Sequence, residues 1–277
     1  MVWQCRDFSL PLDRVRVMGV VNVTPDSFSD GGRFSGAAAV AHGMRLVGEG
    51  ADLVDVGGES SRPGAAEVPV EEELARVLPV VGGLVREGAK VSVDTRRAAV
   101  ARAALDAGAH AVNDISAGLD AGMFRAARDA GAGMALMRGG SDVWWERKPI
   151  GKLKGLPFAH ARMARAFLRR RVACALQAGI AAAALVVDPG VGFTDGAGED
   201  VLLLRMVGSL AKIAPVMVGV SRKRFIGRLS GAAEPAGRLA GSLAAALFAV
   251  SRGARIVRVH DVAETVRALR VWEGLDA

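Results

Sequence analysis

The sequence has no tyrosine and two cysteines, and aromatic side chains of all kinds make up 5% of its 277 residues. Cys5 and Cys174 are too few for a disulfide framework, and they lack the paired spacing of a zinc site. We interpret both as small, buried or partly buried side chains. The low cysteine content favours a reducing compartment, so we expect a cytoplasmic location.

The chain also lacks a long apolar run. Its longest nearly uninterrupted apolar segment, 178–187, has about half the length that a membrane-spanning helix needs. Residues 1–17 carry two aspartates and three arginines without an apolar core, so they do not resemble an export signal. The sequence therefore predicts no association with a membrane.

The chain is basic, with a formal net charge of +7 at pH 7. Nucleic-acid binding requires clustered basic residues, often with aromatic side chains for base stacking. Here the basic residues are scattered. The densest run, 169–171, falls in an expected helix, where a solvent-exposed face is the simpler interpretation. The charge therefore favours a small anionic substrate and no nucleic-acid partner.

Apolar residues, 51% of the chain, fall in short runs that recur roughly every 35 residues, the length of one strand plus one helix. These runs are continuous, as in parallel strands buried on both faces. Strands are expected at 15–21, 53–56, 90–93, 111–113, 133–137, 184–187, 215–220 and 255–259. Alanine-rich helices are expected at 36–48, 70–87, 97–107, 121–130, 158–178, 199–211, 235–252 and 262–273.

This alternation predicts a closed (β/α)8 TIM barrel of the α/β class, with one domain over residues 1–277. An open doubly wound sheet is the alternative, but it usually carries a glycine-rich phosphate-binding sequence after its first strand, and none is present. In TIM barrels the catalytic groups lie at the carboxyl ends of the strands. In order, these ends carry Asn22; Asp55 and Glu59; Asp94; Asn113 and Asp114; Arg138; Asp188; Ser221, Arg222 and Lys223; and Arg258, His260 and Asp261. One polar end is often a helix cap, whereas eight predict a shared site at the barrel mouth.

Several of these strand ends belong to longer motifs. The motifs are NVTPDSFSDGG (22–32), DVGGESSRPG (55–64), VDT (93–95), NDI (113–115), DPGVGF (188–193), SRK (221–223) and RVHDV (258–262). In these motifs the chain resembles the dihydropteroate synthase family from residue 18 to its C-terminal region. The first, second and last motifs are long and specific, whereas VDT alone would mean little. The family fold is a (β/α)8 barrel, in agreement with the strand pattern.

The resemblance implies a transferase of folate biosynthesis. Such an enzyme condenses 6-hydroxymethyl-7,8-dihydropterin diphosphate with 4-aminobenzoate to give dihydropteroate and pyrophosphate. Mg²⁺ assists, bound mainly through the diphosphate and water. The resemblance also implies inhibition by sulfonamides that mimic 4-aminobenzoate, and a homodimer, for which the apolar helix 235–252 is one candidate interface.

The matching positions imply a role for each residue. The pterin edge of alternating donors and acceptors would meet Asp94, Asn113, Asp188 and Lys223. The diphosphate would meet Asn22, Arg258 and His260, with Asn22 also nearest Mg²⁺. The 4-aminobenzoate pocket would consist of Phe28, Ser61, Arg62, Pro63, Phe193 and Ser221. Catalytic roles are implied for Asp30, Arg62 and Lys223, and the loops that carry Asp30 and Arg62 would close to exclude water from a pterin cation.

The sequence departs from the family pattern at three places. Arg138 stands where the family commonly has a histidine, Thr194-Asp195 follow Phe193 where Gly-Lys is frequent, and Ser61 replaces a threonine. A non-catalytic or weakly active pterin-binding protein therefore remains an alternative. A pterin-dependent methyltransferase is a third interpretation, but such a protein has no use for the diphosphate motifs.

Overall fold

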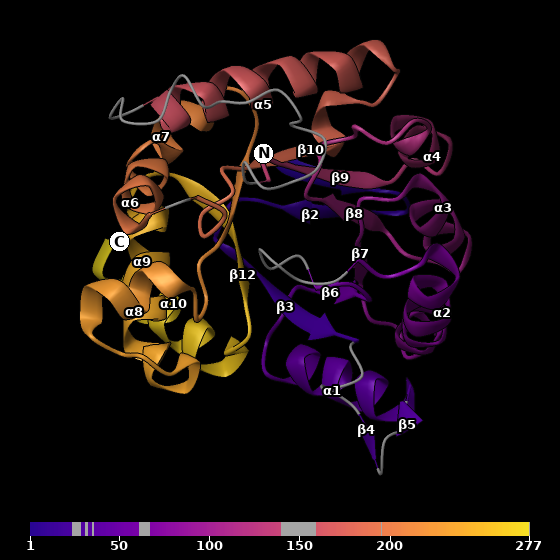
Figure 1. Ribbon diagram of the computed structural model, residues 1–277, viewed down its shortest axis with the longest axis horizontal. Helices are drawn as coiled ribbons and strands as arrows, with labels where there is room; N and C mark the ends of the chain where they lie inside the picture. Colours follow the sequence, from indigo (N-terminus) through magenta and orange to yellow (C-terminus); the bar gives the residue numbers. More distant parts are fainter. Residues whose placement is uncertain are drawn as a thin grey trace.

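Eight parallel strands close into a barrel with helices around it, which confirms the predicted fold (Figure 1). The computed structural model describes residues 1–23, 29–30, 33–34, 36–60, 67–139, 159–194 and 196–276, with the backbone alone at 29–30, 33–34, 159–162 and 276. Around the barrel the strand order is β10, β11, β12, β3, β6, β7, β8, β9. Their bounds are β3 Arg16–Asn22, β6 Leu53–Gly57, β7 Val91–Asp94, β8 Ala111–Asp114, β9 Gly133–Met137, β10 Leu185–Asp188, β11 Val216–Gly219 and β12 Ala254–Val259.

Helices cover the outside of the barrel (Figure 1). Their bounds are α1 Gly36–Gly48, α2 Val70–Arg86, α3 Ala98–Asp106, α4 Met123–Asp129, α5 Ala159–Gln177, α6 Ala197–Arg205, α7 Val207–Leu210, α8 Arg224–Ser230, α9 Leu239–Ser251 and α10 Val262–Asp276. Two short 3-10 turns, Ala182–Ala184 and Pro235–Arg238, precede β10 and α9, and a small ladder joins β4 Ser29–Asp30 to β5 Arg33–Phe34. The predicted ranges agree closely for α1 to α5 and for the start of α10.

Three helical predictions need correction. The predicted helix 199–211 is divided into α6 and α7, and the predicted helix 235–252 begins as a 3-10 turn before α9. The sequence pattern does not predict α8, which follows the polar end of β11 directly. Its seven residues contain only two buried apolar side chains, Phe225 and Ile226. Such a short segment does not display a helical period.

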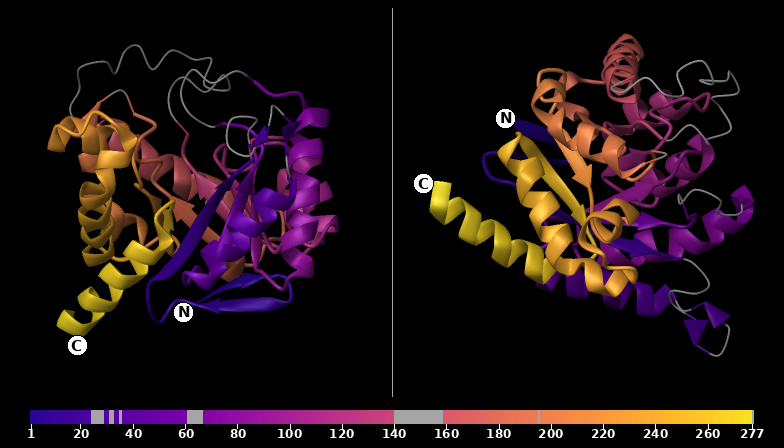
Figure 2. Two further views of the ribbon diagram at one scale, coloured as in Figure 1. Left: turned by 90° about the horizontal axis from the view of Figure 1, so that it is seen from below. Right: turned by 60° about the vertical axis from the view of Figure 1, so that its left-hand side comes forward.

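A hairpin that the sequence pattern does not predict covers the amino-terminal end of the barrel. Its strands are β1 Val2–Cys5 and β2 Phe8–Pro11, paired antiparallel (Figure 2). Trp3 is fully buried, and its Nε1 donates a hydrogen bond of 2.9 Å to the carbonyl oxygen of Ala184, just before β10. Trp3, Cys5, Leu10 and Leu12 pack against the apolar residues inside the barrel. The open mouth therefore lies at the carboxyl ends of the strands.

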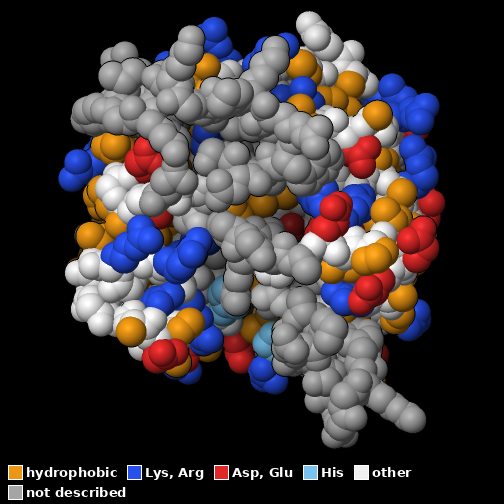
Figure 3. Space-filling model, in the orientation of Figure 1, with side chains coloured by type: hydrophobic (Ala, Val, Ile, Leu, Met, Phe, Trp, Pro, Cys, Tyr) orange, Lys and Arg blue, Asp and Glu red, His pale blue; other side chains and the backbone are white. Residues whose placement is uncertain are grey.

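The exterior of the barrel shows two further features. Apolar side chains of the strands and helices form one continuous cluster between the two layers, and acidic and basic side chains are interspersed on the face drawn in Figure 3.

Among the described residues, none of the helices is both long enough and apolar enough to cross a membrane. The last turns of α10 extend away from the barrel, as Figure 2 shows.

Candidate functional site

The interior of the barrel changes from apolar to polar along the strands. Leu53, Ala111, Val186 and Ile256 pack together inside the barrel. Because side chains two residues apart in a strand lie on the same face, the next inward positions are polar. They are Asp55 on β6, Asn113 on β8, Asp188 on β10 and Arg258 on β12. The alternation therefore places these polar groups at the mouth, as predicted.

Arg258 connects two carboxylates at the centre of this group. Its Nε lies 2.6 Å from Oδ2 of Asp55, and its Nη2 lies 2.7 Å from Oδ2 of Asp94. Burial and the neighbouring carboxylates Asp55, Glu73 and Asp114 raise the pKa of Asp94 to about 7, although Arg258 opposes the shift. The pairing keeps the guanidinium charged, since the adjacent carboxylates raise the pKa of Arg258. The predicted Asp94 and Arg258 therefore lie in one site.

Asn113 is joined to the same cluster. Its Nδ2 donates to Oδ2 of Asp55 at 2.8 Å, whereas its Oδ1 is buried and has no hydrogen-bond partner among the described residues. A buried acceptor without a partner is costly in a folded protein unless a ligand or water satisfies it. The amide oxygen is therefore available to a donor on a ligand at the mouth.

Asp188 is held by the turn that follows β10. The backbone N–H of Gly190 donates to its Oδ1 at 2.7 Å. Gly190 has a φ of +78°, and a Cβ atom there would lie 1.9 Å from the carbonyl oxygen of Arg138, so glycine is required at this position. Burial raises the pKa of the Asp188 carboxyl, while Lys223 and Arg258 oppose the shift.

Lys223 and Phe193 meet on the same side of the mouth. The Nζ of Lys223 lies 4.7 Å from the centroid of the Phe193 ring and also donates to the carbonyl oxygen of Val191. Burial lowers the pKa of Lys223 to about 8, against the attraction of Asp188. The structure thus places one titratable amine beside an aromatic ring, a cation–π arrangement.

The remaining predicted residues with described side chains lie at or just after the carboxyl ends of β3, β11 and β12. Ser221 Oγ accepts a hydrogen bond of 3.2 Å from the backbone N–H of His260 and lies 3.1 Å from its Nδ1. Asn22 ends β3 and is paired in register with Gly57 of β6. Arg258 and His260 are two residues apart at the end of β12, so they share one side of the strand path.

Four other polar residues near the strand ends bind their own loops or neighbouring side chains, which corrects their placement in the shared site. They are Asp114, Arg222, Asp261 and Glu59. Asp114 accepts hydrogen bonds from the backbone N–H groups of Ser116 and Gly118, at 2.7 and 2.6 Å. Arg222 forms an ion pair with Asp261. Capping and ion pairing therefore account for these residues, as they do for many polar groups at strand ends.

Glu59, the fourth of these residues, forms ion pairs with Arg96 and Arg97. Its Oε2 lies 2.9 Å from Nη1 of Arg97, which in turn pairs with the buried Glu73. Arg97 Nη2 donates to the carbonyl oxygen of Val68 at 2.7 Å. Glu59 therefore belongs to an ion-pair network, the Arg97 network, formed by Glu59, Glu67, Val68, Glu73, Arg96 and Arg97.

Several predicted site residues lie outside the described part of the chain. They are Phe28, Ser61, Arg62 and Pro63. Of Asp30 the backbone alone is described, in β4. Their proposed roles stay predictions.

The departures from the family pattern have local partners. Arg138 is 3% exposed, and its backbone N–H donates to the carbonyl oxygen of Asp188 at 3.3 Å. Thr194 Oγ1 lies 2.9 Å from Oδ1 of Asp200, and the same oxygen accepts from the backbone N–H of Gly192 at 2.6 Å. Thr194 therefore braces the turn that carries Phe193, whereas Asp195 lies outside the described residues.

Asp55 is one of the strand-end residues that predict the shared site, but the family resemblance implies no role for it. It is fully buried and joins Arg258 to Asn113. The available signal is its position, two residues after the interior Leu53 on a strand with a known inward face. The motif itself directs attention to the loop that follows.

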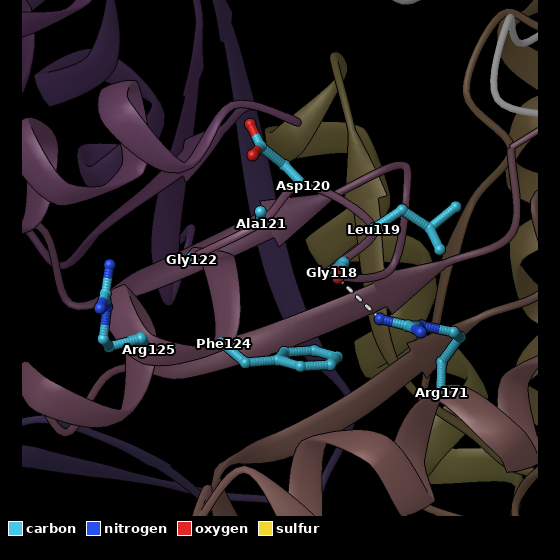
Figure 4. Close-up of a pocket in the computed structure, with 8 residues that line it drawn as sticks. All are labelled: Gly118, Leu119, Asp120, Ala121, Gly122, Phe124, Arg125 and Arg171. Carbon is cyan, nitrogen blue, oxygen red and sulfur yellow. Dashed lines mark hydrogen bonds between the residues drawn. The ribbon is translucent and has the colours of Figure 1, made fainter.

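A cavity also lies between the loop after β8, α4 and α5 (Figure 4). It has a volume of about 560 Å³ and is lined by Gly118, Leu119, Asp120, Ala121, Gly122, Phe124, Arg125 and Arg171. Arg171 donates to the carbonyl oxygen of Gly118 at 2.6 Å and lies over the Phe124 ring, so it is engaged by its own fold. Arg169 and Arg170 are exposed, as predicted for the run 169–171, whereas Arg171 is partly buried.

Known proteins resemble this chain over most of its length. The family model described as "Pterin binding enzyme" matches residues 18–260. The chain belongs to this pterin-binding enzyme family. The match includes six of the seven motifs in full and most of the last.

Relatives within the family are more specific. A dihydropteroate synthase of Neisseria meningitidis is 44% identical over 283 residues, covering 99% of this chain and 97% of the relative. The Xanthomonas albilineans dihydropteroate synthase structure with 4-aminobenzoic acid is 46% identical, has a TM-score of 0.90, and is matched over 100% of this chain and 98% of that one. The structure from the same organism in complex with 7,8-dihydropteroate is 44% identical, with a TM-score of 0.89 and coverage of 100% and 99%. The chain groups with the dihydropteroate synthases, transferases that make dihydropteroate.

Proposed function

We propose that the chain condenses 6-hydroxymethyl-7,8-dihydropterin diphosphate with 4-aminobenzoate. The bond between the pterin methylene carbon and the diphosphate oxygen breaks, and its electron pair leaves with pyrophosphate. The amine nitrogen forms the new bond to carbon and then loses a proton. The observation that carries the proposal is the cluster of Asp94, Asn113, Asp188, Lys223 and Arg258 at one end of the barrel. Two related dihydropteroate synthase structures, one with 4-aminobenzoic acid and one with 7,8-dihydropteroate, also support it.

The pterin is the ligand that the interior carboxylates and amide suit best. Its edge presents N–H donors beside a ring carbonyl, and Asp94, Asp188 and the unpartnered Oδ1 of Asn113 are acceptors. The ammonium of Lys223 is the donor for the ring carbonyl. Directional pairing of this kind favours a pterin over a ring without the same pattern.

The diphosphate would lie toward Arg258, His260 and Asn22. The Arg258 guanidinium stabilises negative charge that develops on the leaving oxygen as the carbon–oxygen bond breaks. Mg²⁺ supplies further charge neutralisation when it is bound with the diphosphate. Among the described residues no group of three or more His, Cys, Asp or Glu side chains could hold a metal. In the proposal the ion is carried mainly by diphosphate and water, with Asn22 as one oxygen ligand.

The 4-aminobenzoate would lie on the Phe193 and Lys223 side of the mouth. The ring of Phe193 offers a stacking surface, and Ser221 offers a hydroxyl group. Phe28, Ser61, Arg62 and Pro63 complete the pocket in the proposal, and Asp30 and Arg62 assist catalysis with Lys223. A sulfonamide that mimics 4-aminobenzoate is expected to compete for the same position.

The active form is proposed to be a homodimer that meets through α9. Ala240, Ala244 and Phe248 are spaced by four residues on the exposed face of this apolar helix, and Phe248 is 40% exposed. A second copy would cover this face. Light scattering after gel filtration should give a dimer for the wild type and a monomer for Phe248→Glu, and an unchanged dimer would place the interface elsewhere. The cytoplasmic location stays a prediction.

Pyrophosphate release tests the proposed function directly. The chain is mixed with the pterin diphosphate and Mg²⁺, with and without 4-aminobenzoate, and dihydropteroate is measured in parallel. Release coupled to dihydropteroate formation is the expected result. Pterin binding without product would contradict it and favour the non-catalytic alternative.

A further inference from the structure

Asp55 occupies an unusual position among the carboxylates of the mouth. The resemblance implies no role for it, yet its side chain is fully buried, whereas that of Asp94 is 15% exposed. Arg258 pairs with both carboxylates, through Nε to Asp55 and through Nη2 to Asp94. A ligand that enters the mouth can therefore reach Asp94 more readily than Asp55.

A single oxygen of Asp55 accepts hydrogen bonds from two donors. Its Oδ2 accepts from Nε of Arg258 at 2.6 Å and from Nδ2 of Asn113 at 2.8 Å. An ionised carboxylate only accepts hydrogen bonds, so it fixes which end of the Asn113 amide faces it. The amide nitrogen is therefore committed to Asp55, and the buried Oδ1, which has no partner among the described residues, is left for a ligand.

We propose that Asp55 is a positioning residue for pterin binding. Asp55 keeps Arg258 paired with itself and fixes the orientation of the Asn113 amide. Asp94 and the Asn113 oxygen are therefore available to the pterin. The inference rests on the proposed function, because it takes the pterin as the ligand of Asp94. Without Asp55, Arg258 would pair with Asp94 alone, and the pterin would have to displace it.

The same geometry predicts a change in the titration of Asp94. The charged groups that act on it electrostatically are Arg258 on β12, Asp55 on β6, Glu73 on α2, Asp114 on β8 and Lys223 after β11. Removing the charge of Asp55 removes a negative charge near Asp94 and leaves Arg258 paired with Asp94 alone. Both effects stabilise the ionised form, so the pKa of Asp94 falls from about 7.

Asp55→Asn tests the proposal, because it removes the charge and keeps the shape. Binding of 6-hydroxymethyl-7,8-dihydropterin is measured by calorimetry between pH 5.5 and 9. In the wild type, affinity should rise with pH through about 7 as Asp94 ionises. In the variant we expect affinity about tenfold weaker at pH 8, and this rise shifted down by about one pH unit.

Ser92→Ala is the matched control. Ser92 is paired with Asp55 across β6 and β7, is fully buried, and has no hydrogen bond from its hydroxyl group among the described residues. Its hydroxyl group therefore forms no hydrogen bond with Arg258. The control should keep pterin affinity within about twofold and leave the pH dependence in place, as expected for the loss of a hydroxyl group that forms no hydrogen bond.

Three results would overturn the proposal. They are unchanged affinity in Asp55→Asn, weaker affinity with an unmoved pH dependence, and an equal effect of Ser92→Ala. Circular dichroism checks folding, and Asp55→Ser, which is smaller and uncharged, replaces Asp55→Asn if that variant does not fold. If the wild type binds no pterin, the proposed function fails. Carbon-13 NMR titration of the Asp94 carboxyl still decides the positioning role: a lower pKa in the variant supports it, and an unchanged pKa overturns it.

Discussion

Gly192 and Lys223 pack so closely that a Cβ atom on Gly192 would lie 2.4 Å from Cδ of Lys223. Gly192 also has a φ of +87°, a backbone conformation that other residues rarely adopt. The turn after β10 and the lysine after β11 therefore fix each other. The position of the Lys223 amine depends on the absence of a side chain at residue 192.

Gly192→Ala should consequently weaken pterin binding. We expect about tenfold lower affinity as Lys223 is displaced, and a loss of about 1–3 kcal/mol in the free energy of unfolding from backbone strain. Calorimetry with the pterin and urea denaturation measure the two effects. Gly196→Ala is the control, because a Cβ atom there meets nothing within 4 Å. Equal effects of the two substitutions would contradict the packing argument.

The titration of Lys223 predicts the pH dependence of pterin binding on the alkaline side. Its pKa is lowered by burial to about 8, and the ring carbonyl of the pterin pairs with the protonated amine. Affinity should therefore fall above pH 8, by about tenfold per pH unit. Lys223→Met should bind the pterin more weakly and lack this decline. A decline that persists in the variant would assign it to another group.

The same shift predicts an effect on stability. The pKa of Lys223 is about 8 in the folded chain and 10.5 ordinarily, so between these values the unfolded chain binds more protons. Below pH 8 the buried charge of Lys223 lowers the free energy of unfolding by its full amount. This penalty becomes smaller as the pH rises from 8 to 10.5. Lys223→Met should be more stable than the wild type at pH 7, with a difference that shrinks toward pH 10.5. Urea denaturation of both proteins at several pH values tests this, and a constant difference would contradict it.

The Arg97 network predicts a large effect on stability. Glu73 has a side chain that is 1% exposed, and Arg97→Ala would remove the cation with which it pairs. Glu59 would keep its pair with Arg96, at 3.3 Å. The expected cost is about 3–5 kcal/mol in the free energy of unfolding. Arg128→Ala removes an exposed ion pair with Asp129 and should cost less than about 1 kcal/mol. If Glu73→Gln does not partly rescue Arg97→Ala, the cost comes from lost packing and not from the buried charge.

The barrel could be predicted from the sequence because each strand is a continuous apolar run that ends at a polar residue. The same signal located Asp94, Asn113, Asp188 and Arg258, whose inward direction follows from the alternation of side chains along each strand. The apolar runs alone do not separate Asp94 from Asp114, since both are polar residues at strand ends. The alternation does separate them, because Asp114 follows the inward Asn113 directly and so lies on the opposite face of β8. One faces the barrel and the other accepts hydrogen bonds from its own loop.

The sequence pattern also could not predict which residues of the site pair with each other. Asp55 and Arg258 are 203 residues apart in the chain, and they meet because closure of the barrel places β12 and β6 on either side of β3. A sequence pattern identifies the residue types at each strand end but not which of them form hydrogen bonds across the barrel. The positioning role of Asp55 therefore emerges only from the structure.

The amino-terminal hairpin, which the sequence pattern does not predict, should be essential for stability. Trp3 is fully buried between the hairpin and the barrel, and its Nε1 donates to the carbonyl oxygen of Ala184. Trp3→Ala should lower the free energy of unfolding by about 3–5 kcal/mol. Trp3→Phe, which keeps most of the apolar surface but loses the donor, should cost about 1–3 kcal/mol because a buried acceptor is left unpaired.

The hairpin lies at the end of the barrel opposite the mouth, so its loss should affect stability before ligand binding. At a temperature where Trp3→Phe remains folded, its pterin affinity should match that of the wild type within about twofold. Thermal denaturation and calorimetry at that temperature measure the two properties separately. A drop in pterin affinity without unfolding would show that the interior layer of Leu53 and Ile256 transmits changes from the hairpin to the polar residues above it.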